Sequence, residues 1–501
     1  MAGAGAGANL LAMRSHNAAL VLDLLRTAGS DGISRLELAE RTGLTPQAVS
    51  KITARLREDG LAAEAGRRAS TGGKPRTVLR LVPEAGHAVG VHLDRDEVRA
   101  VLVDLRGTVV GERRAALDLG AGARAVLAAV TEAVRAVVTE AGRAVVREAG
   151  RAVVTEAGRA VVRESGRAAV TETGRAAAME AGRAAVTEVL PAGSLLAHAG
   201  SLLGVGVALP GPLDHVRGVL HRVTGFPEWD GFPLRQALAE RLGVPVVVDK
   251  DTNAAALGLA AGGEAGSFAY LHLGTGLGAG LVIGGSVHRG ARTGAGEFGH
   301  QVIQLDGPPC TCGDRGCVEA LCLGAVARGD VEEAARVLGA GAANLVGLLD
   351  IDVVLLGGRT VAAAPEAFVR GVGAVLGARA RRTGEDAVPV RVAPGGGRVV
   401  AVGAAQLVLG PVFGRGTAEG RGPDSWWGRG PDPAGALAWA CRRRPGRSAP
   451  GGTPVPCARP RVSGGRAERP GPAQSHPTPA GPPRAPGRCP ARCSPLPRPP
   501  R

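Results

Sequence analysis

Three cysteines and one histidine lie within eighteen residues, and this cluster constrains the fold more than any other feature of the chain. The four residues are His300, Cys310, Cys312 and Cys317. Glycines and prolines between them let the backbone turn tightly enough for all four side chains to face one point. Thiolates with one imidazole suit a closed tetrahedral Zn²⁺, which leaves no open position for a catalytic water. We therefore predict a structural zinc site, with a loop of reduced cysteines as the alternative.

Two glutamates flank the predicted ligands: Glu297 precedes His300, and Glu319 follows Cys317. If zinc fixes one nitrogen of His300, the other nitrogen is free to point at something else. Two carboxylates and an oriented imidazole around one pocket would suit a polyhydroxylated ligand. The sequence therefore predicts a sugar-binding pocket beside the metal.

The motif Glu297-Phe-Gly-His300, followed by the three cysteines and Glu319, closely resembles the signature of the ROK family. That family contains sugar-responsive repressors and sugar kinases. The resemblance covers roughly residues 84 to 410 and implies an α/β fold with two actin-like, ribonuclease-H-like lobes. It also implies that the histidine and cysteines bind zinc, while Glu297, His300 and Glu319 contact the sugar.

The net charge of +15 is segregated along the chain. Residues 411–501 hold sixteen arginines against four acidic residues, and 21 of the 35 prolines without periodicity, so they are predicted to be a disordered tail. Nonspecific DNA binding and a read-through extension are both open interpretations of it. Residues 1–13 are predicted to be a disordered arm. Residues 14–82 hold twelve basic and seven acidic residues, and only this basic segment has a foldable pattern.

The start of the chain lacks both a basic region and a continuous apolar region, so it does not read as a secretion signal. No run of the ~20 apolar residues needed to cross a bilayer is evident. We expect a cytoplasmic protein without membrane insertion.

Residues 14–82 carry the signals of three short helices. Apolar residues recur at helical spacing between positions 17 and 27, and Ser34 with Glu37 forms a capping box before an inward-facing set of Leu36, Leu38 and Ala39. Thr45 is predicted to cap the third helix, with Pro46 at its first position. Its buried stripe is predicted to be Val49, Ile52 and Leu56.

The opposite face of the third helix carries donors that suit base edges and phosphates in a major groove. These residues are Gln47, Ser50, Lys51, Thr53 and Arg55. A basic, glycine-containing segment follows, with Arg67, Arg68, Lys74 and Arg76 as candidate phosphate contacts. We predict a winged helix-turn-helix that binds double-stranded DNA, with a docking module as the alternative. The segment resembles the winged helix that precedes the ROK domain in the family's repressors.

Residues 83–410 form the predicted ROK domain, and its first phosphate loop departs from the family pattern. Strands are predicted at 88–93 and 98–105. In ROK kinases the first strand leads into Asp-x-Gly-Gly-Thr, whose matching positions here are His92, Asp94, Arg95 and Asp96. No glycine remains, and two carboxylates stand where a triphosphate would approach. This departure argues against kinase activity.

Two further motifs resemble the kinase machinery. Asp251 and Asn253, after a buried strand, match the family's Asn-Asp-x-Asn, in which the aspartate is the base, but Lys250 replaces the first asparagine. Lys250 could pair with Asp251 and lower its basicity, and a plain capping role for Asp251 stays open. The glycine-rich turn containing Gly274, Thr275, Gly276 and Gly278 matches the second phosphate loop, although an ordinary hairpin has the same pattern.

Residues 131–186 are seven copies of an eight-residue unit. Eight residues rotate a helix by about 80° beyond two turns, so apolar positions should spiral around it and stay out of a core. We predict a solvated helical insert at 131–188, with an oligomerisation arm as the alternative. The chain between Glu319 and the strand at 353–356 is shorter than the resemblance leads us to expect, which predicts missing helices in the second lobe.

These observations predict a sugar-responsive DNA-binding transcriptional regulator, a repressor that works as a homodimer or tetramer. The effector would be a small sugar or sugar phosphate bound at Asp251, Asn253, Glu297, His300 and Glu319. The alternative is a sugar kinase that uses Asp251 as base and Mg²⁺-ATP. A third hypothesis is a degenerate product whose sugar lobe no longer closes.

Overall fold

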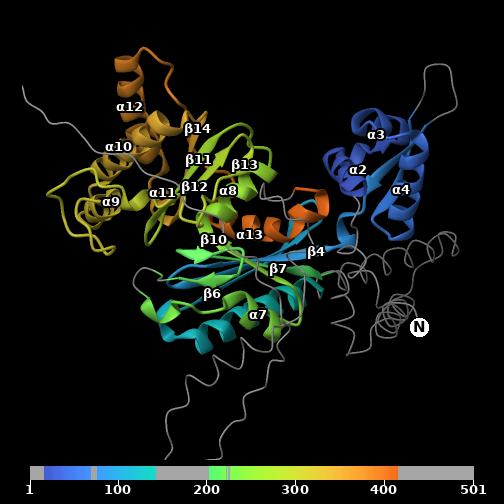
Figure 1. The fold of residues 1–501 in the computed structure, drawn as a ribbon, viewed down its shortest axis with the longest axis horizontal. Coiled ribbons are helices and arrows are strands. Elements are labelled where there is room, and N and C mark those ends of the chain that lie inside the picture. The colour runs from blue at the N-terminus through green and yellow to red at the C-terminus, as the bar shows by residue number, and fades with distance from the viewer. Residues whose placement is uncertain (1–15, 69–75, 143–201, 222, 224–225, 416–501) are drawn as a thin grey trace, which may run out of the picture. The chain divides into compact units, whose positions relative to one another are not determined.

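The computed structural model describes residues 16–68, 76–142, 202–221, 223 and 226–415. The predicted arm at 1–13, Lys74, the octad repeat beyond 142 and the tail beyond 415 lie outside these residues. The fold is α/β, with a small N-terminal domain followed by two five-stranded sheets (Figure 1).

The N-terminal domain has the three predicted helices and a wing. Its elements are α2 (His16–Thr27), β1 (Ile33–Ser34), α3 (Arg35–Thr42), α4 (Pro46–Glu58), β2 (Ala62–Arg68) and β3 (Arg76–Leu81), with the strands in the order β1-β3-β2. The capping box is present, because Ser34 accepts from the Glu37 amide and Glu37 accepts from the Ser34 amide. Thr45 caps α4 through the Ala48 amide, as predicted.

Two side chains of this domain lie on the side opposite to the predicted one. Leu36 was expected to face inward and is 41% exposed, while Leu38 and Ala39 are buried as predicted. Thr53 was expected on the DNA face but is fully buried, and its hydroxyl donates to the Val49 carbonyl at 2.8 Å. A threonine can satisfy its hydroxyl on its own helix, so its polarity is a weak guide to exposure.

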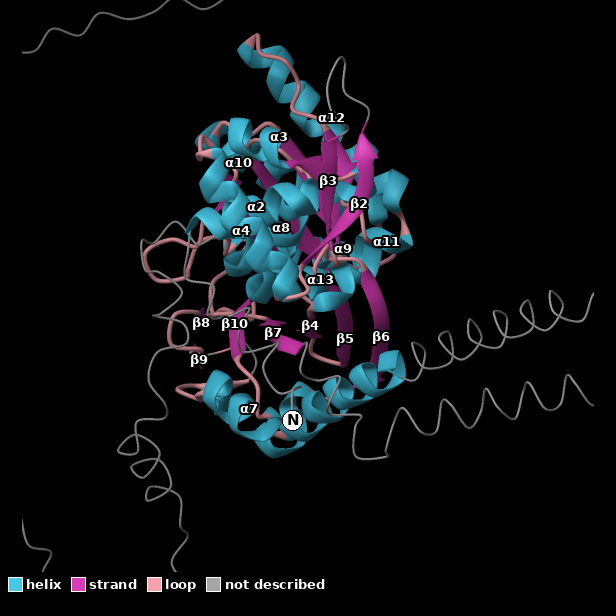
Figure 2. Cartoon of the chain, turned by 90° about the vertical axis from the view of Figure 1, so that its right-hand side faces the viewer, coloured by secondary structure: helices cyan, strands magenta, loops and turns pink. Residues whose placement is uncertain are grey.

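The first lobe contains β4 (His87–Leu93), β5 (Glu97–Asp104), β6 (Val109–Ala116), β7 (Leu202–Leu209) and β10 (Val246–Lys250). The strand order is β10-β7-β4-β5-β6, with β4, β5 and β6 antiparallel and β4, β7 and β10 parallel. Helix α7 (Leu234–Leu242) and the helix at 123–142 cover one face of this sheet (Figure 2).

The second lobe has the strand order β13-β12-β11-β14-β15. This is the arrangement of the first lobe, because the sheet β6-β5-β4-β7-β10 also places its strands in the order third, second, first, fourth and fifth along the chain. The strands of the second lobe are β11 (Phe268–Leu273), β12 (Leu277–Ile283), β13 (Ser286–Val287), β14 (Val353–Gly357) and β15 (Val390–Val392). Its outer face packs against α9 (Val318–Ala327), α10 (Val331–Leu349) and α12 (Pro365–Thr383). Thus α9 and α10 occupy the segment in which helices were predicted to be missing, and they cover this face.

Two helices lie between the sheets, α8 (Asp251–Ala261) and α13 (Val399–Leu409) (Figure 1). Their backbones are in direct contact at Gly403, where a Cβ atom would come within 1.8 Å of the Ala254 carbonyl oxygen. A Cβ atom at Gly90 of β4 would come equally close to the Ala401 carbonyl oxygen. Helix α13 is therefore seated directly on the first sheet and on α8, at distances that only glycine permits.

Helix α13 continues into a short 3₁₀ turn, η9 (Gly410–Phe413), which contacts α2. Phe413 is buried, and the Arg26 guanidinium lies 5.3 Å from the centre of its ring. Arg415 forms an ion pair with Asp23 at 3.2 Å. The folded chain therefore extends a few residues beyond the predicted start of the tail at 411.

The first repeat units join a core, which corrects one prediction. Ala133, Val134, Val137 and Ala141 are buried against the first sheet, together with Val126 and Val130. The start of the repeat continues the helix before it, and over this short length its apolar side chains stay on one face at helical spacing. The spiral predicted for the repeat becomes significant only over several copies.

One helical stretch of the described chain, Gly396–Phe413, is long and apolar enough to cross a membrane by length and composition, contrary to the expectation that no such run occurs. Of this window, 61% is buried inside the protein. Its apolar character matches its place between the sheets.

Candidate functional site

A cavity between the two lobes brings together most of the predicted sugar-binding residues. Its lining includes Asp251, Glu297, His300 and Glu319. Asp251 begins α8, Glu297 and His300 lie on the loop after β13, and Glu319 is in the first turn of α9. These side chains come from elements far apart in the sequence, so the fold supports the prediction that they share one pocket.

Asn253 does not line this cavity, in contrast to the prediction. It is fully buried, and its Nδ2 donates to Asp249 Oδ1 at 3.0 Å. Asp249 is also buried and pairs with Arg289 at 2.7 Å. Asn253 therefore helps to fix the end of β10 and does not face a ligand. Asn253 is two positions after Asp251, the first residue of α8, and at about 100° per residue its side chain leaves the helix on nearly the opposite face.

Lys250 pairs with a different carboxylate from the one predicted. Its Nζ lies 2.5 Å from Glu297 Oε1 and 2.9 Å from the Ala295 carbonyl oxygen. Asp251 instead accepts from the Thr252 amide at 2.6 Å. Lys250 therefore forms an ion pair with Glu297, which lies 47 residues away in the chain and could not be predicted as its partner.

Glu319 is fixed by the glycine-rich turn. Its Oε2 accepts from the Leu277 amide at 2.7 Å, and only 8% of the residue is exposed. The turn itself is the hairpin between β11 and β12, closed by a hydrogen bond from the Gly274 amide to the Gly276 carbonyl oxygen at 2.9 Å. Thr275, Gly276 and Gly278 line the cavity, whereas Gly274 does not.

The predicted metal ligands form one compact cluster. Ligand atoms of His300, Cys310, Cys312 and Cys317 all lie within 4.8 Å of one another. The nearest pairs are Cys312 Sγ and Cys317 Sγ at 3.7 Å, and Cys310 Sγ and His300 Nδ1 at 3.6 Å. A tight turn brings the thiols together, because the Cys310 amide donates to the Asp314 carbonyl oxygen at 2.8 Å. His300 thus belongs to both the metal-binding cluster and the cavity.

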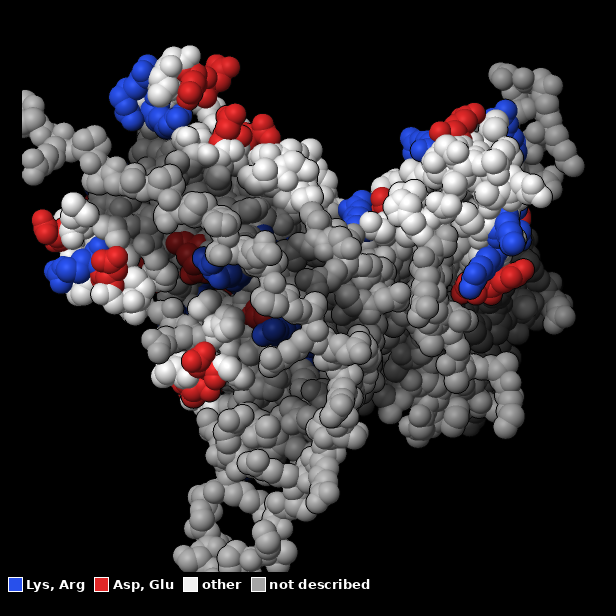
Figure 3. All heavy atoms as spheres, in the orientation of Figure 1, with Lys and Arg blue, Asp and Glu red and all other residues white. Residues whose placement is uncertain are grey.

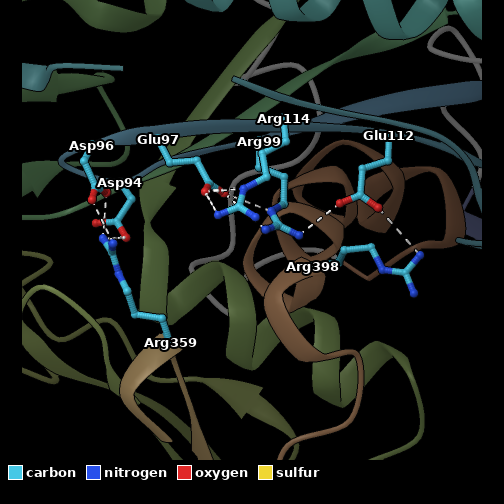
Figure 4. A network of polar contacts seen from close by, with 8 residues as sticks. All are labelled: Asp94, Asp96, Glu97, Arg99, Glu112, Arg114, Arg359 and Arg398. Carbon is cyan, nitrogen blue, oxygen red and sulfur yellow. Dashed lines mark hydrogen bonds and ion pairs between the residues drawn. The ribbon is translucent and has the colours of Figure 1, made fainter. Parts of the chain in front are cut away.

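An ion-pair network occupies the place of the missing phosphate loop (Figure 4). Arg359, which begins α11 (Arg359–Ala363) in the second lobe, contacts Asp94 at 2.9 Å and Asp96 at 2.6 Å in the first lobe. Thr275 donates to the other oxygen of Asp94 at 3.0 Å. Arg359 could not be predicted as a partner from the sequence, because 263 residues separate it from Asp96.

A second set of ion pairs lies beside the first and reaches toward α13 (Figure 4). Its pairs are Arg114–Glu97, Arg99–Glu97 at 3.2 Å, Arg99–Glu112 at 2.9 Å and Arg398–Glu112 at 3.8 Å. Arg398 immediately precedes α13. This second set therefore ties the edge of the first sheet to the start of the central helix.

A histidine pair lies beside this turn. Burial lowers the pKa of His92 to about 4, so this residue is neutral at physiological pH. Its ring lies 6.2 Å from that of His272, whose Nδ1 is 2.9 Å from the Tyr270 hydroxyl. Among ROK kinases the position of His92 holds an aspartate by resemblance, so a charged group has been replaced by a neutral one.

Arg359→Met should reduce stability in a pH-dependent way. The hydrogen bond from Arg359 is the main cause that lowers the pKa of Asp96. A depressed carboxyl pKa contributes stability above the unfolded value of ~3.9 and loses it as pH falls further. We expect the variant to unfold about 2–4 °C below wild type at pH 7, since a half-exposed pair contributes about 1 kcal/mol.

Thermal unfolding between pH 7 and pH 2.5 checks this, because the difference between the two proteins should stay constant down to about pH 4 and then shrink as pH falls through the lowered pKa of the folded Asp96. Arg370→Met is the matched control, since Arg370 is an exposed cation within one lobe. An equal deficit for Arg359→Met at both pH values would contradict the carboxylate explanation.

The predicted DNA-binding side chains on α4 are exposed. They are Gln47, Ser50, Lys51 and Arg55, and Arg76 at the start of β3 is exposed as well. Among the described side chains that are visible in Figure 3, basic and acidic groups lie side by side on the drawn face. The described part of the N-terminal domain therefore offers a set of donors on one helix.

Comparison with known proteins agrees with both domains. Residues 151–328 match the model of the ROK family, and residues 22–62 match a winged helix-turn-helix DNA-binding model. The xylose repressor of Bacillus subtilis is 26% identical over 290 residues, which cover 57% of this chain and 61% of that protein. The glucokinase of Thermotoga maritima is 41% identical over 121 residues, 23% of this chain and 38% of that enzyme.

A solved ROK family transcriptional regulator, a homologue of the Escherichia coli MLC protein, shares the fold with a TM-score of 0.53 and 19% identity. The match covers 80% of this chain and 98% of that structure. The fold is therefore shared with that regulator, while the match to the ROK family model is confined to residues 151–328 and the match to a winged helix-turn-helix to residues 22–62. The chain is homologous to the xylose repressors, although it spans only about three fifths of the Bacillus subtilis relative's length.

Proposed function

We propose that this protein is a sugar-responsive transcriptional repressor that binds a double-stranded DNA operator through α4 and the wing. The observation that carries the proposal is the joining of an exposed donor set on α4 to a carboxylate- and histidine-lined cavity in one folded unit. A cytoplasmic location and a homodimer or tetramer follow as parts of the same proposal, because operators are commonly read by paired domains.

The metal proposed for the cysteine cluster is zinc in a structural role. Tetrahedral Zn²⁺ with bonds of about 2.3 Å to sulfur and 2.0–2.1 Å to nitrogen places neighbouring sulfurs about 3.8 Å apart, and sulfur and nitrogen about 3.6 Å apart. The corresponding separations here are 3.7 and 3.6 Å. The donor set therefore fits zinc, which would hold His300 with one nitrogen and orient the ring that lines the cavity.

The proposed mechanism is a shift between lobe arrangements. A sugar that contacts Asp251 and Glu319 touches both lobes, and so it favours the arrangement in which both contacts are made. Asp251 begins α8, which packs on α13, and η9 after α13 contacts α2. These packed elements give the sugar site a route to the DNA-binding domain.

Gel shifts on the protein's own upstream region, repeated with D-xylose, D-glucose and other sugars, test this function. We expect binding that weakens with salt and that one sugar changes at least tenfold. Binding insensitive to salt, or unchanged by every sugar in the panel, would count against a sugar-responsive repressor.

A sugar kinase is the second candidate, supported by the stretch that matches glucokinase and by Asp251 in the cavity. It would need Mg²⁺-ATP on the turn at Gly274–Gly278. Against it, Asp94, Asp96 and Arg359 fill the position of the first phosphate loop. Coupled ADP release with hexoses distinguishes the two candidates, and turnover abolished by Asp251→Asn would favour the kinase.

A further inference from the structure

Lys250 is a buried cation in the wall of the proposed sugar cavity. Only 4% of its side chain is exposed, yet the residue lines the cavity beside Asp251. Its stem passes Gly211, where a Cβ atom would stand 3.1 Å from Cγ and Cδ of the lysine. The ammonium group is therefore held in one place by close packing.

The hydrogen bonds of this ammonium group are incomplete. A lysine Nζ carries three N–H donors. Two have acceptors, the Ala295 carbonyl oxygen and Glu297 Oε1. Among the residues that the structure describes, no third acceptor bonds to it. Because a buried charge is costly unless it is fully hydrogen-bonded, an oxygen atom placed in the cavity by a ligand would be strongly favoured.

The charges around Lys250 favour a neutral ligand. Its positive charge is balanced by Glu297. Of the other carboxylates in the lining, Asp94 pairs with Arg359, whereas Asp251 and Glu319 add negative charge. The other cation in the lining is Arg95, whose guanidinium carbon lies 5.8 Å from the centre of the Phe226 ring. A carboxylate or phosphate on the ligand would face two carboxylates without an unpaired lysine to offset them.

We infer that Lys250 is a specificity-determining residue, which donates its third N–H to a hydroxyl oxygen of a neutral sugar, while the carboxylates around it disfavour anionic sugars. The inference rests on the proposed sugar-responsive function and assigns one direct contact within it. The contact is particular to this chain, because the resemblance places an asparagine at this position.

Isothermal titration of the full chain with D-xylose, D-glucose and D-glucuronate tests the inference. We expect wild type to prefer a neutral sugar over D-glucuronate, and Lys250→Met to bind that sugar roughly ten- to a hundredfold more weakly, as expected for loss of a charged hydrogen bond. Lys250→Gln, which keeps a donor, should lose less. Arg292→Met, an exposed cation on the loop before Glu297, is the matched control and should bind like wild type.

Monodeoxy analogues of the preferred sugar identify the hydroxyl group involved. Removing that group should cost affinity in wild type and little in Lys250→Met. Equal sugar affinity in wild type and Lys250→Met would overturn the inference alone, as would a preference for D-glucuronate. Absence of any sugar binding by wild type would overturn the proposed function as well. If Lys250→Met unfolds, as thermal melting would show, the affinity of Lys250→Gln decides instead.

Discussion

Cys312→Ser is expected to release the metal from the protein and to weaken sugar binding at the same time. Cys312 is an exposed member of the cluster, so serine fits without disturbing the core, but it is a much poorer zinc ligand. Metal binding contributes to folding, and we expect the melting temperature to fall by roughly 5–10 °C. Sugar affinity should fall with it, because His300 belongs to both sites.

Metal analysis, thermal melting and sugar titration on one purified sample provide the measurement. Wild type should hold about one zinc per chain, and the variant clearly less. Cys322→Ala is the matched control, because Cys322 is buried and its thiol donates to the Ala334 carbonyl oxygen at 3.1 Å, outside the cluster. Full zinc content in Cys312→Ser, or none in wild type, would refute the assignment.

Lys51→Ala combined with Arg55→Ala is expected to abolish most operator binding. The two residues are one helical turn apart on α4 and both are exposed. Each contact to a base edge contributes about 1–3 kcal/mol, so the double variant should bind at least about thirtyfold more weakly. If one of the pair contacts phosphate instead, the slope of log affinity against log salt should fall by about one.

Arg57→Ala is the matched control for this experiment. Arg57 lies on the same helix but pairs with Glu64 of β2 at 3.2 Å. It should therefore leave operator affinity within about twofold of wild type. Fluorescence anisotropy at several salt concentrations measures all three proteins. A loss in Arg57→Ala as large as in the double variant would mean that α4 does not present one DNA-reading face.

Local signals in the sequence were sufficient to predict where the second and third helices of the N-terminal domain begin and which four residues form the Cys/His cluster. Ser34 and Thr45 mark helix starts through hydrogen bonds made within three residues, and the four metal-binding residues lie close together in the chain. Such features depend on nearby residues only, so they can be predicted without knowing the fold.

Contacts between distant segments could not be predicted in this way. Lys250 was expected to pair with its neighbour Asp251, but the loop after β13 brings Glu297 to it. Asn253 has the motif position of a sugar contact, yet the helical turn directs it toward Asp249. Arg359 meets its partners only because the two sheets stack around α8 and α13. Each of these outcomes depends on tertiary structure.

The position of α13 has a consequence for synthesis of the protein. This helix is the last α-helix of the described chain, yet it lies between two sheets whose strands are all made before it. While a ribosome is still translating residues 87–392, the inner faces of both lobes lack their shared cover. Chaperones would therefore meet an incomplete, apolar intermediate until translation has passed Leu409 and that helix can be inserted.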